Sequence, residues 1–142
     1  MIRILLISCW MGILFLFTCS LRIEELVTSG VLQFRFDAQP DLSELLQSLP
    51  PNAEISFWTR KIGHAFCFFI LAILLLTKYP SVHAFGISLI YAGATEILQL
   101  FFYRDGRLFD IGFDAIGIVL AIILFGKSSK VIQGNIPSKR SL

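Results

Sequence analysis

The fold is decided by residues 96–117, which read EILQLFFYRDGRLFDIGFDAIG. Two apolar segments in this stretch are separated by a polar turn at residues 104–107. The first segment carries Glu96, and the second begins with Asp110 and Asp114. Ionisable side chains inside lipid are costly and usually mark functional sites. These three carboxylates therefore need an explanation.

Composition limits the class of protein. The chain has 142 residues, which is enough for one domain, and 56% of them are hydrophobic. This share exceeds that of ordinary soluble domains. The net charge of +2 gives no reason to expect a nucleic-acid partner. The cysteines lie in apolar runs without metal-binding spacing, so we expect them to be small apolar residues and not a disulfide framework.

Long apolar runs predict the architecture. A run of about 18 or more apolar residues is a candidate membrane helix. The sequence therefore predicts an all-α membrane protein, a bundle of four transmembrane helices in a single domain over residues 1–142. The predicted elements are helices at about 4–21, 62–79, 82–103 and 108–125, one long extramembrane loop at 22–61, and a flexible tail at 126–142.

The first run has a competing interpretation as a cleaved signal peptide, because it lies at the N-terminus. Against cleavage, the run is longer than the apolar region of an ordinary signal peptide, and only Arg3 precedes it. We therefore favour a retained membrane helix.

The long loop carries two local patterns. Phe34 and Phe36 alternate with polar residues, as a half-buried strand would. Further on, Asp41 followed by Glu44 predicts the start of a helix. One face of this predicted helix is apolar and consists of Leu42, Leu45, Leu46 and Leu49. The helix should lie on the membrane surface or over the bundle, and it should end at the prolines that follow.

Alternating helix direction brings distant polar residues to one side of the membrane. The second predicted helix begins, the third ends and the fourth begins at that side, and the short turns make these helices neighbours. We call the residues that meet there the polar cluster: Lys61, His64, Glu96, Gln99, Arg104, Arg107, Asp110 and Asp114. Both chain termini should lie on the opposite side.

The polar cluster allows several kinds of chemistry. His64 with Glu96 or Asp110 is a candidate acid–base pair, since histidine titrates near neutral pH; the alternative is a histidine that only joins two helices. Oxygen ligands with an imidazole can also hold a metal. Nearby cations compete for the same carboxylates, however, and we expect neither a metal nor another cofactor.

A charge-compensated network is the interpretation that we prefer. Arg104 would form a two-pronged contact with a carboxylate, and Gln99 would hydrogen-bond within the network. Arg107 and Lys61 lie nearer the surface and could receive an anionic lipid headgroup.

These residues resemble the VanZ-like family, which is named for a teicoplanin-resistance accessory protein. The resemblance covers about residues 58–125. It rests on RKIGH at residues 60–64, EILQ at residues 96–99, and then Arg104, Asp110, Asp114 and Gly117. The sequence departs from the family's pattern in two ways: Cys67 and Phe68 replace an acidic–aromatic pair, and Asp114 stands where Asn is common. The resemblance implies a role in the bacterial cell envelope or in glycopeptide resistance, and no established reaction.

Three functions remain open at this point. The first in rank is an envelope factor that binds a lipid headgroup, a lipid-linked precursor or a partner protein. The second is a small intramembrane enzyme that acts on an envelope lipid, with His64, Glu96 and Asp110 as its catalytic groups. The third is a proton-coupled transporter, for which inverted repeats are lacking. The basic tail favours cytoplasmic termini in the bacterial cytoplasmic membrane.

Overall fold

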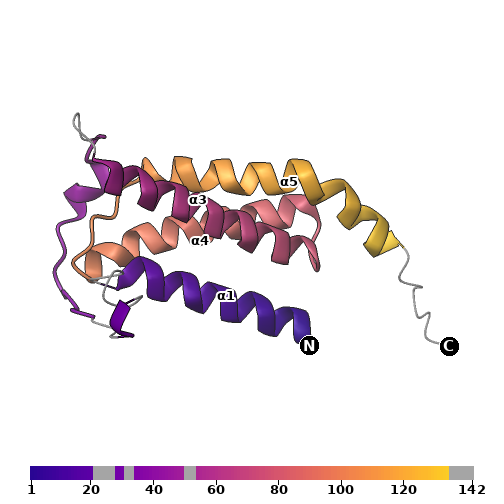
Figure 1. Ribbon diagram of the computed structural model, residues 1–142, viewed down its shortest axis with the longest axis horizontal. Helices are drawn as coiled ribbons and strands as arrows, with labels where there is room; N and C mark the ends of the chain where they lie inside the picture. The colour runs from indigo at the N-terminus through magenta and orange to yellow at the C-terminus, as the bar shows by residue number, and fades with distance from the viewer. Residues whose placement is uncertain (21–27, 31–33, 50–53, 135–142) are drawn as a thin grey trace.

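The computed structural model describes residues 1–20, 28–30, 34–49 and 54–134, with side chains up to residue 126. These residues form four α-helices and one short 3-10 helix, and none of them is in a strand. The elements are α1 (Ile2–Cys19), η1 (Leu42–Leu46), α3 (Ile55–Leu76), α4 (Ser81–Phe101) and α5 (Asp110–Gly134) (Figure 1). The prediction of an all-helical protein is confirmed for the described residues.

Three of the helices can cross a membrane. By length and composition, α1, α3 and α4 are apolar enough to span a bilayer. Helix α5 runs beside α3 and in the same direction, whereas α1 and α4 run the opposite way (Figure 1). That α5 also crosses the membrane, as the sequence predicts, stays a prediction.

Two helices extend beyond the apolar runs that predicted them. Helix α3 begins at Ile55 and not near residue 62, and α5 continues to Gly134 and does not end near residue 125. Hydropathy detects only the part of a helix that suits lipid, and a helix can continue past it into water. The expected flexible tail is thus helical up to Gly134, and residues 135–142 lie outside the described residues.

The loop patterns fold differently from their predictions. Residues 34–37 have no regular secondary structure, and Asp37 N donates to the carbonyl of Phe101 at 2.8 Å. The ring of Phe34 contacts Phe15 and Phe102, and that of Phe36 contacts Phe101 and Phe102. For residues 34–36 the strand prediction is wrong, because the two phenylalanines pack against aromatic rings at the end of α4 and the backbone there is irregular; residues 31–33 lie outside the described residues.

The predicted helix after residue 40 is the 3-10 helix η1. Its start is as expected, because Asp41 Oδ1 accepts a hydrogen bond from Ser43 N at 2.9 Å. Leu42 and Leu46 are 57% and 78% exposed, so much of the apolar face is not covered by the bundle. Lying on a membrane surface would bury these leucines.

The core lies between the long helices and is built with small residues. The most extensive helix–helix contact is between α3 and α5. Fully buried alanines and larger side chains alternate in the core: Phe68, Leu71, Ala72, Ala84, Ala92, Ile118 and Ala121. Small side chains let membrane helices approach closely.

Helix α1 is attached by hydrogen bonds to backbone carbonyls. Trp10 Nε1 donates to the carbonyl of Cys67 on α3 at 3.0 Å, and Tyr91 Oη on α4 donates to that of Met11 at 2.6 Å. At the start of α1, Arg3 donates to the carbonyl of Thr77 at 2.6 Å. These bonds add to the packing of α1 against α3 and α4.

Candidate functional site

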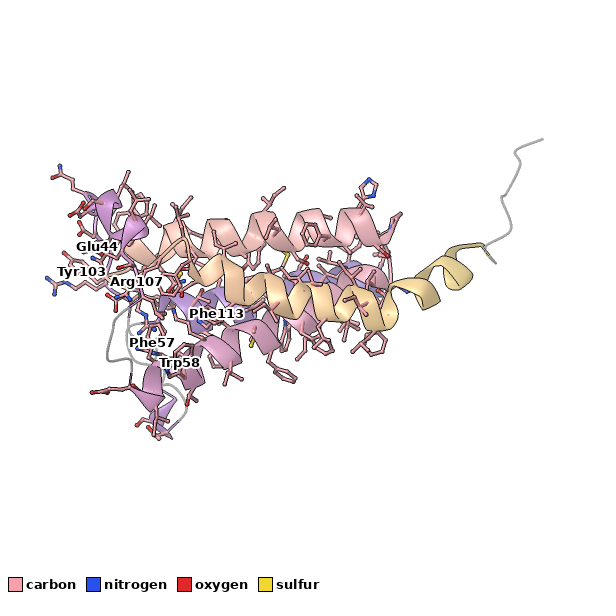
Figure 2. All side chains as sticks on the ribbon, turned by 90° about the horizontal axis from the view of Figure 1, so that it is seen from above. Glu44, Phe57, Trp58, Tyr103, Arg107 and Phe113 are labelled. Atoms are coloured by element: carbon pink, nitrogen blue, oxygen red, sulfur yellow. The ribbon has the colours of Figure 1, made fainter. Side chains whose placement is uncertain are left out.

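The polar cluster forms at one end of the bundle. Here α3 and α5 begin and α4 ends, close to η1 (Figure 1). Figure 2 shows Phe57, Trp58, Tyr103 and Arg107 gathered at this end. The helix ends that carry the polar cluster thus lie together, and the functional roles of its residues stay predictions.

The turn after α4 folds back over the helix end. Arg104 N donates to the carbonyl of Gln99 at 3.0 Å and Tyr103 N to that of Leu100 at 3.4 Å, with Tyr103 at φ 53°. This is the Schellman arrangement, which usually uses glycine at the left-handed position. Next in the turn, a Cβ atom on Gly106 would collide with the carbonyl oxygen of Glu96. Glycine is thus required for the turn to lie against α4.

Glu96 is held from both sides. Its side chain is fully buried; Oε1 accepts from Gln99 Nε2 at 2.7 Å, and Oε2 accepts from the backbone N of Arg107 at 2.8 Å. Gln99 thus donates a hydrogen bond to Glu96, and its role in a wider charge network stays a prediction. Both donors are uncharged groups, so these two hydrogen bonds bring no positive charge to Glu96.

Asp110 is paired with Lys61. The ammonium group of Lys61 forms an ion pair with Asp110 Oδ2, and the two side chains are only 14% and 4% exposed. The rings of Phe57 and Phe109 also lie near the ammonium group, at 4.9 and 5.5 Å from their centroids. Lys61 therefore points inward, and its predicted role as a surface contact for lipid is less well supported than its role within the bundle.

For Arg104, the predicted two-pronged contact with a carboxylate stays a prediction. Asp110 is paired with Lys61, and the carboxylate oxygens of Glu96 accept from Gln99 and from the backbone N of Arg107. Arg104 is half-buried in the turn. Burial lowers the pKa of its guanidinium, and the positive charge of Arg60 adds to this. Arginine still remains charged at neutral pH.

His64 lies between carboxylates from two other helices. Candidate ligand atoms of His64, Glu96 and Asp114 all lie within 4.8 Å of one another. Asp114 is fully buried, and neither of its carboxylate oxygens has a hydrogen-bond partner within the described part of the chain. The acids grouped with His64 are thus Glu96 and Asp114, whereas the predicted catalytic acid Asp110 is paired with Lys61.

The sequence did not predict an apolar groove beside the turn. The groove has a volume of about 700 Å³ and lies between residues 45–49 of the loop and the start of α5. Its lining includes Leu45, Leu49, Leu108, Phe109 and Phe113. Leu108 N donates to the carbonyl of Leu45 at 2.9 Å, which holds the two segments together. The repeated leucines predicted an apolar face on the loop segment, but they did not predict that the start of α5 would lie opposite this face.

The fold and the site define a helical membrane protein that buries a charged cluster at one end of its bundle. The chain belongs to the VanZ/LLP1 family, whose family model matches residues 3–129. It is also similar to the uncharacterized membrane protein YwnJ of Bacillus subtilis (strain 168). The two are 38% identical over 122 residues, which cover 82% of this chain and 84% of YwnJ. No solved structure matches the chain.

Proposed function

We propose that the polar end of the bundle binds the anionic headgroup of a lipid or lipid-linked precursor, as part of a role in the bacterial cell envelope or in glycopeptide resistance. The observation that carries this proposal is the guanidinium of Arg107. Its Nε atom is buried, and it has no hydrogen-bond partner among the described residues. A buried donor without a partner requires an explanation, and a bound anion provides one.

The surroundings of Arg107 suit a lipid. The next two residues of the chain, Leu108 and Phe109, line the apolar groove. Arg60 is exposed at the same end of the bundle and adds positive charge. A headgroup at Arg107 would therefore place an acyl chain near a groove that can accept it, while Trp58 and Tyr103 suit the depth of the headgroups.

The test measures lipid binding to the purified protein. Arg107→Gln should weaken binding of phosphatidylglycerol about five- to tenfold, because one basic residue near an anionic surface contributes about 1 kcal/mol. Native mass spectrometry of detergent-purified protein during a lipid titration measures this change. Arg3→Gln, at the opposite end of the bundle, is the matched control and should bind like the wild type. Equal lipid binding by the wild type, Arg107→Gln and Arg3→Gln would contradict the proposal.

A second function is favoured by the position of His64. An imidazole close to two buried carboxylates can transfer protons to and from a bound substrate, so the site could belong to an intramembrane enzyme acting on an envelope lipid. The same lipid titration separates the two functions. A change in the mass of the released lipid indicates an enzyme, whereas binding and release of unchanged lipid indicate a binding protein.

We further propose that the termini lie in the cytoplasm and the polar cluster on the outer side of the bacterial cytoplasmic membrane. Single cysteines at Lys78 and Ser48, both exposed, test this in a variant that lacks the natural cysteines. In intact cells, a membrane-impermeant thiol reagent should label the cysteine at Ser48 and not the one at Lys78. Labelling of the cysteine at Lys78 and not of the one at Ser48 would indicate the opposite orientation. Labelling of both cysteines from outside would contradict the proposed helix topology.

A further inference from the structure

We propose that His64, Glu96 and Asp114 form a binding site for a divalent first-row transition-metal ion, such as Zn²⁺ or Mn²⁺. The site would lie inside the bundle, with one ligand each from α3, α4 and α5. This inference goes beyond lipid binding and stands independently of it.

The geometry allows all three side chains to reach one ion. Their candidate ligand atoms lie within 4.8 Å of one another. Imidazole nitrogen and carboxylate oxygen bind Zn²⁺ at about 2.0–2.2 Å, so ligand atoms on one tetrahedral ion lie roughly 3.5 Å apart. Side-chain rotations that move these atoms by about an ångström close the site without moving the helices.

Asp114 is the observation that points to a cation. Its side chain has no exposed surface, and both of its oxygens are without a hydrogen-bond partner in the described part of the chain. A buried carboxylate without partners is costly, so it must either take up a proton or meet a positive charge. Asp114 already lies beside the two other metal-binding groups.

Two of the neighbouring cations, Lys61 and Arg107, make their described contacts with another acid or through a neutral group. Lys61 is paired with Asp110, and Arg107 meets Glu96 through its backbone N–H. The ion pair of Lys61 is thus made with Asp110, which is not one of the three proposed ligands. Two carboxylates and a neutral imidazole balance a charge of +2, which is the reason for a divalent ion.

The ligand set narrows the choice of metal. A mixture of nitrogen and oxygen ligands suits first-row transition metals better than Mg²⁺ or Ca²⁺, which prefer oxygen alone. Three protein ligands leave at least one coordination position for water or another molecule, as in catalytic zinc sites. Gln99 orients Glu96 through a hydrogen bond of 2.7 Å, as the outer partners of metal ligands commonly do.

The test uses the full-length protein in detergent, stripped with a chelator and free of added lipid. Isothermal titration should show one Zn²⁺ bound per chain, and Zn²⁺ should raise the melting temperature. Asp114→Asn and His64→Ala should each weaken binding by at least about tenfold. Asp105→Asn and His83→Ala change exposed residues of the same types outside the site and should bind like the wild type.

Two results would overturn the site. One is the absence of stoichiometric binding by the wild type, which would leave a protonated Asp114 as the explanation of the unpartnered carboxylate. The other is unchanged affinity in both ligand variants. If those variants fail to fold, the absorption spectrum of Co²⁺ bound to the wild type shows which side chains hold the metal. A spectrum of nitrogen and oxygen ligands supports the site, and a thiolate charge-transfer band, which would place the metal on a cysteine, overturns it.

Discussion

Gly117→Ala should lower the stability of the helix bundle by about 3 kcal/mol, the upper end of the usual cost of overpacking. A Cβ atom at this position would collide with the backbone carbonyl oxygen of Ala65 on α3. Backbone atoms cannot rotate out of the way as a side chain can, so α3 and α5 would have to separate. Thermal unfolding in detergent, followed by circular dichroism, measures the loss.

Gly112 provides the matched control for this substitution. It lies in α5 as well, but a Cβ atom there would meet nothing within 4 Å. Gly112→Ala should therefore be neutral or raise stability by up to about 1 kcal/mol, because alanine favours a helix more than glycine does. Similar melting temperatures for the two variants would show that the contact between α3 and α5 tolerates a wider separation.

Lys61→Met is expected to cost about 3–5 kcal/mol, the usual effect of removing one partner from a buried ion pair. Methionine keeps much of the length of the lysine side chain but removes the positive charge. Asp110, which is 4% exposed, would then be left as a buried carboxylate without its cation. Melting of the purified protein in detergent measures the change, and the exposed neighbour Arg60 offers the control Arg60→Met, expected to be nearly neutral.

A double variant separates the ion pair from other effects of Lys61. Lys61→Met combined with Asp110→Asn removes both charges together, and it should recover a large part of the stability lost in the single variant. If the stability losses of Lys61→Met alone and Asp110→Asn alone simply add up in the double variant, the contributions of Lys61 and Asp110 to stability are independent of each other. The buried pair would then not be the reason for the lysine at this position.

The positively charged side chains of the polar cluster thus have different tasks. Lys61 compensates a carboxylate inside the bundle, between aromatic rings. Arg107 holds Glu96 with its backbone and keeps a buried guanidinium nitrogen without a partner in the described region. Substitution of Lys61 should therefore act mainly on stability, whereas substitution of Arg107 should act mainly on ligand binding.

The sequence alone determined the all-helical class and the end of the bundle at which the polar residues meet. Apolar runs of membrane-spanning length and short turns force consecutive helices to alternate in direction, so residues at a helix start and at the end of the preceding helix become neighbours. The spacing from Asp110 to Asp114 and Gly117 also placed these residues on one face of a helix. All three are buried in the structure.

Which groups of the polar cluster contact one another depends on how the helices pack, and this cannot be derived from sequence spacing. Asp110 and Asp114 are one turn apart on the same face, about 6 Å along the helix axis. Sequence spacing therefore assigns both of them to the cluster without distinguishing Lys61 from His64 as their neighbour. The rotation and height of each helix make that choice, and they depend on side-chain packing and on the close approach of Gly117 to Ala65. The apolar groove has the same origin, since it forms between a loop and a helix that are distant in the sequence.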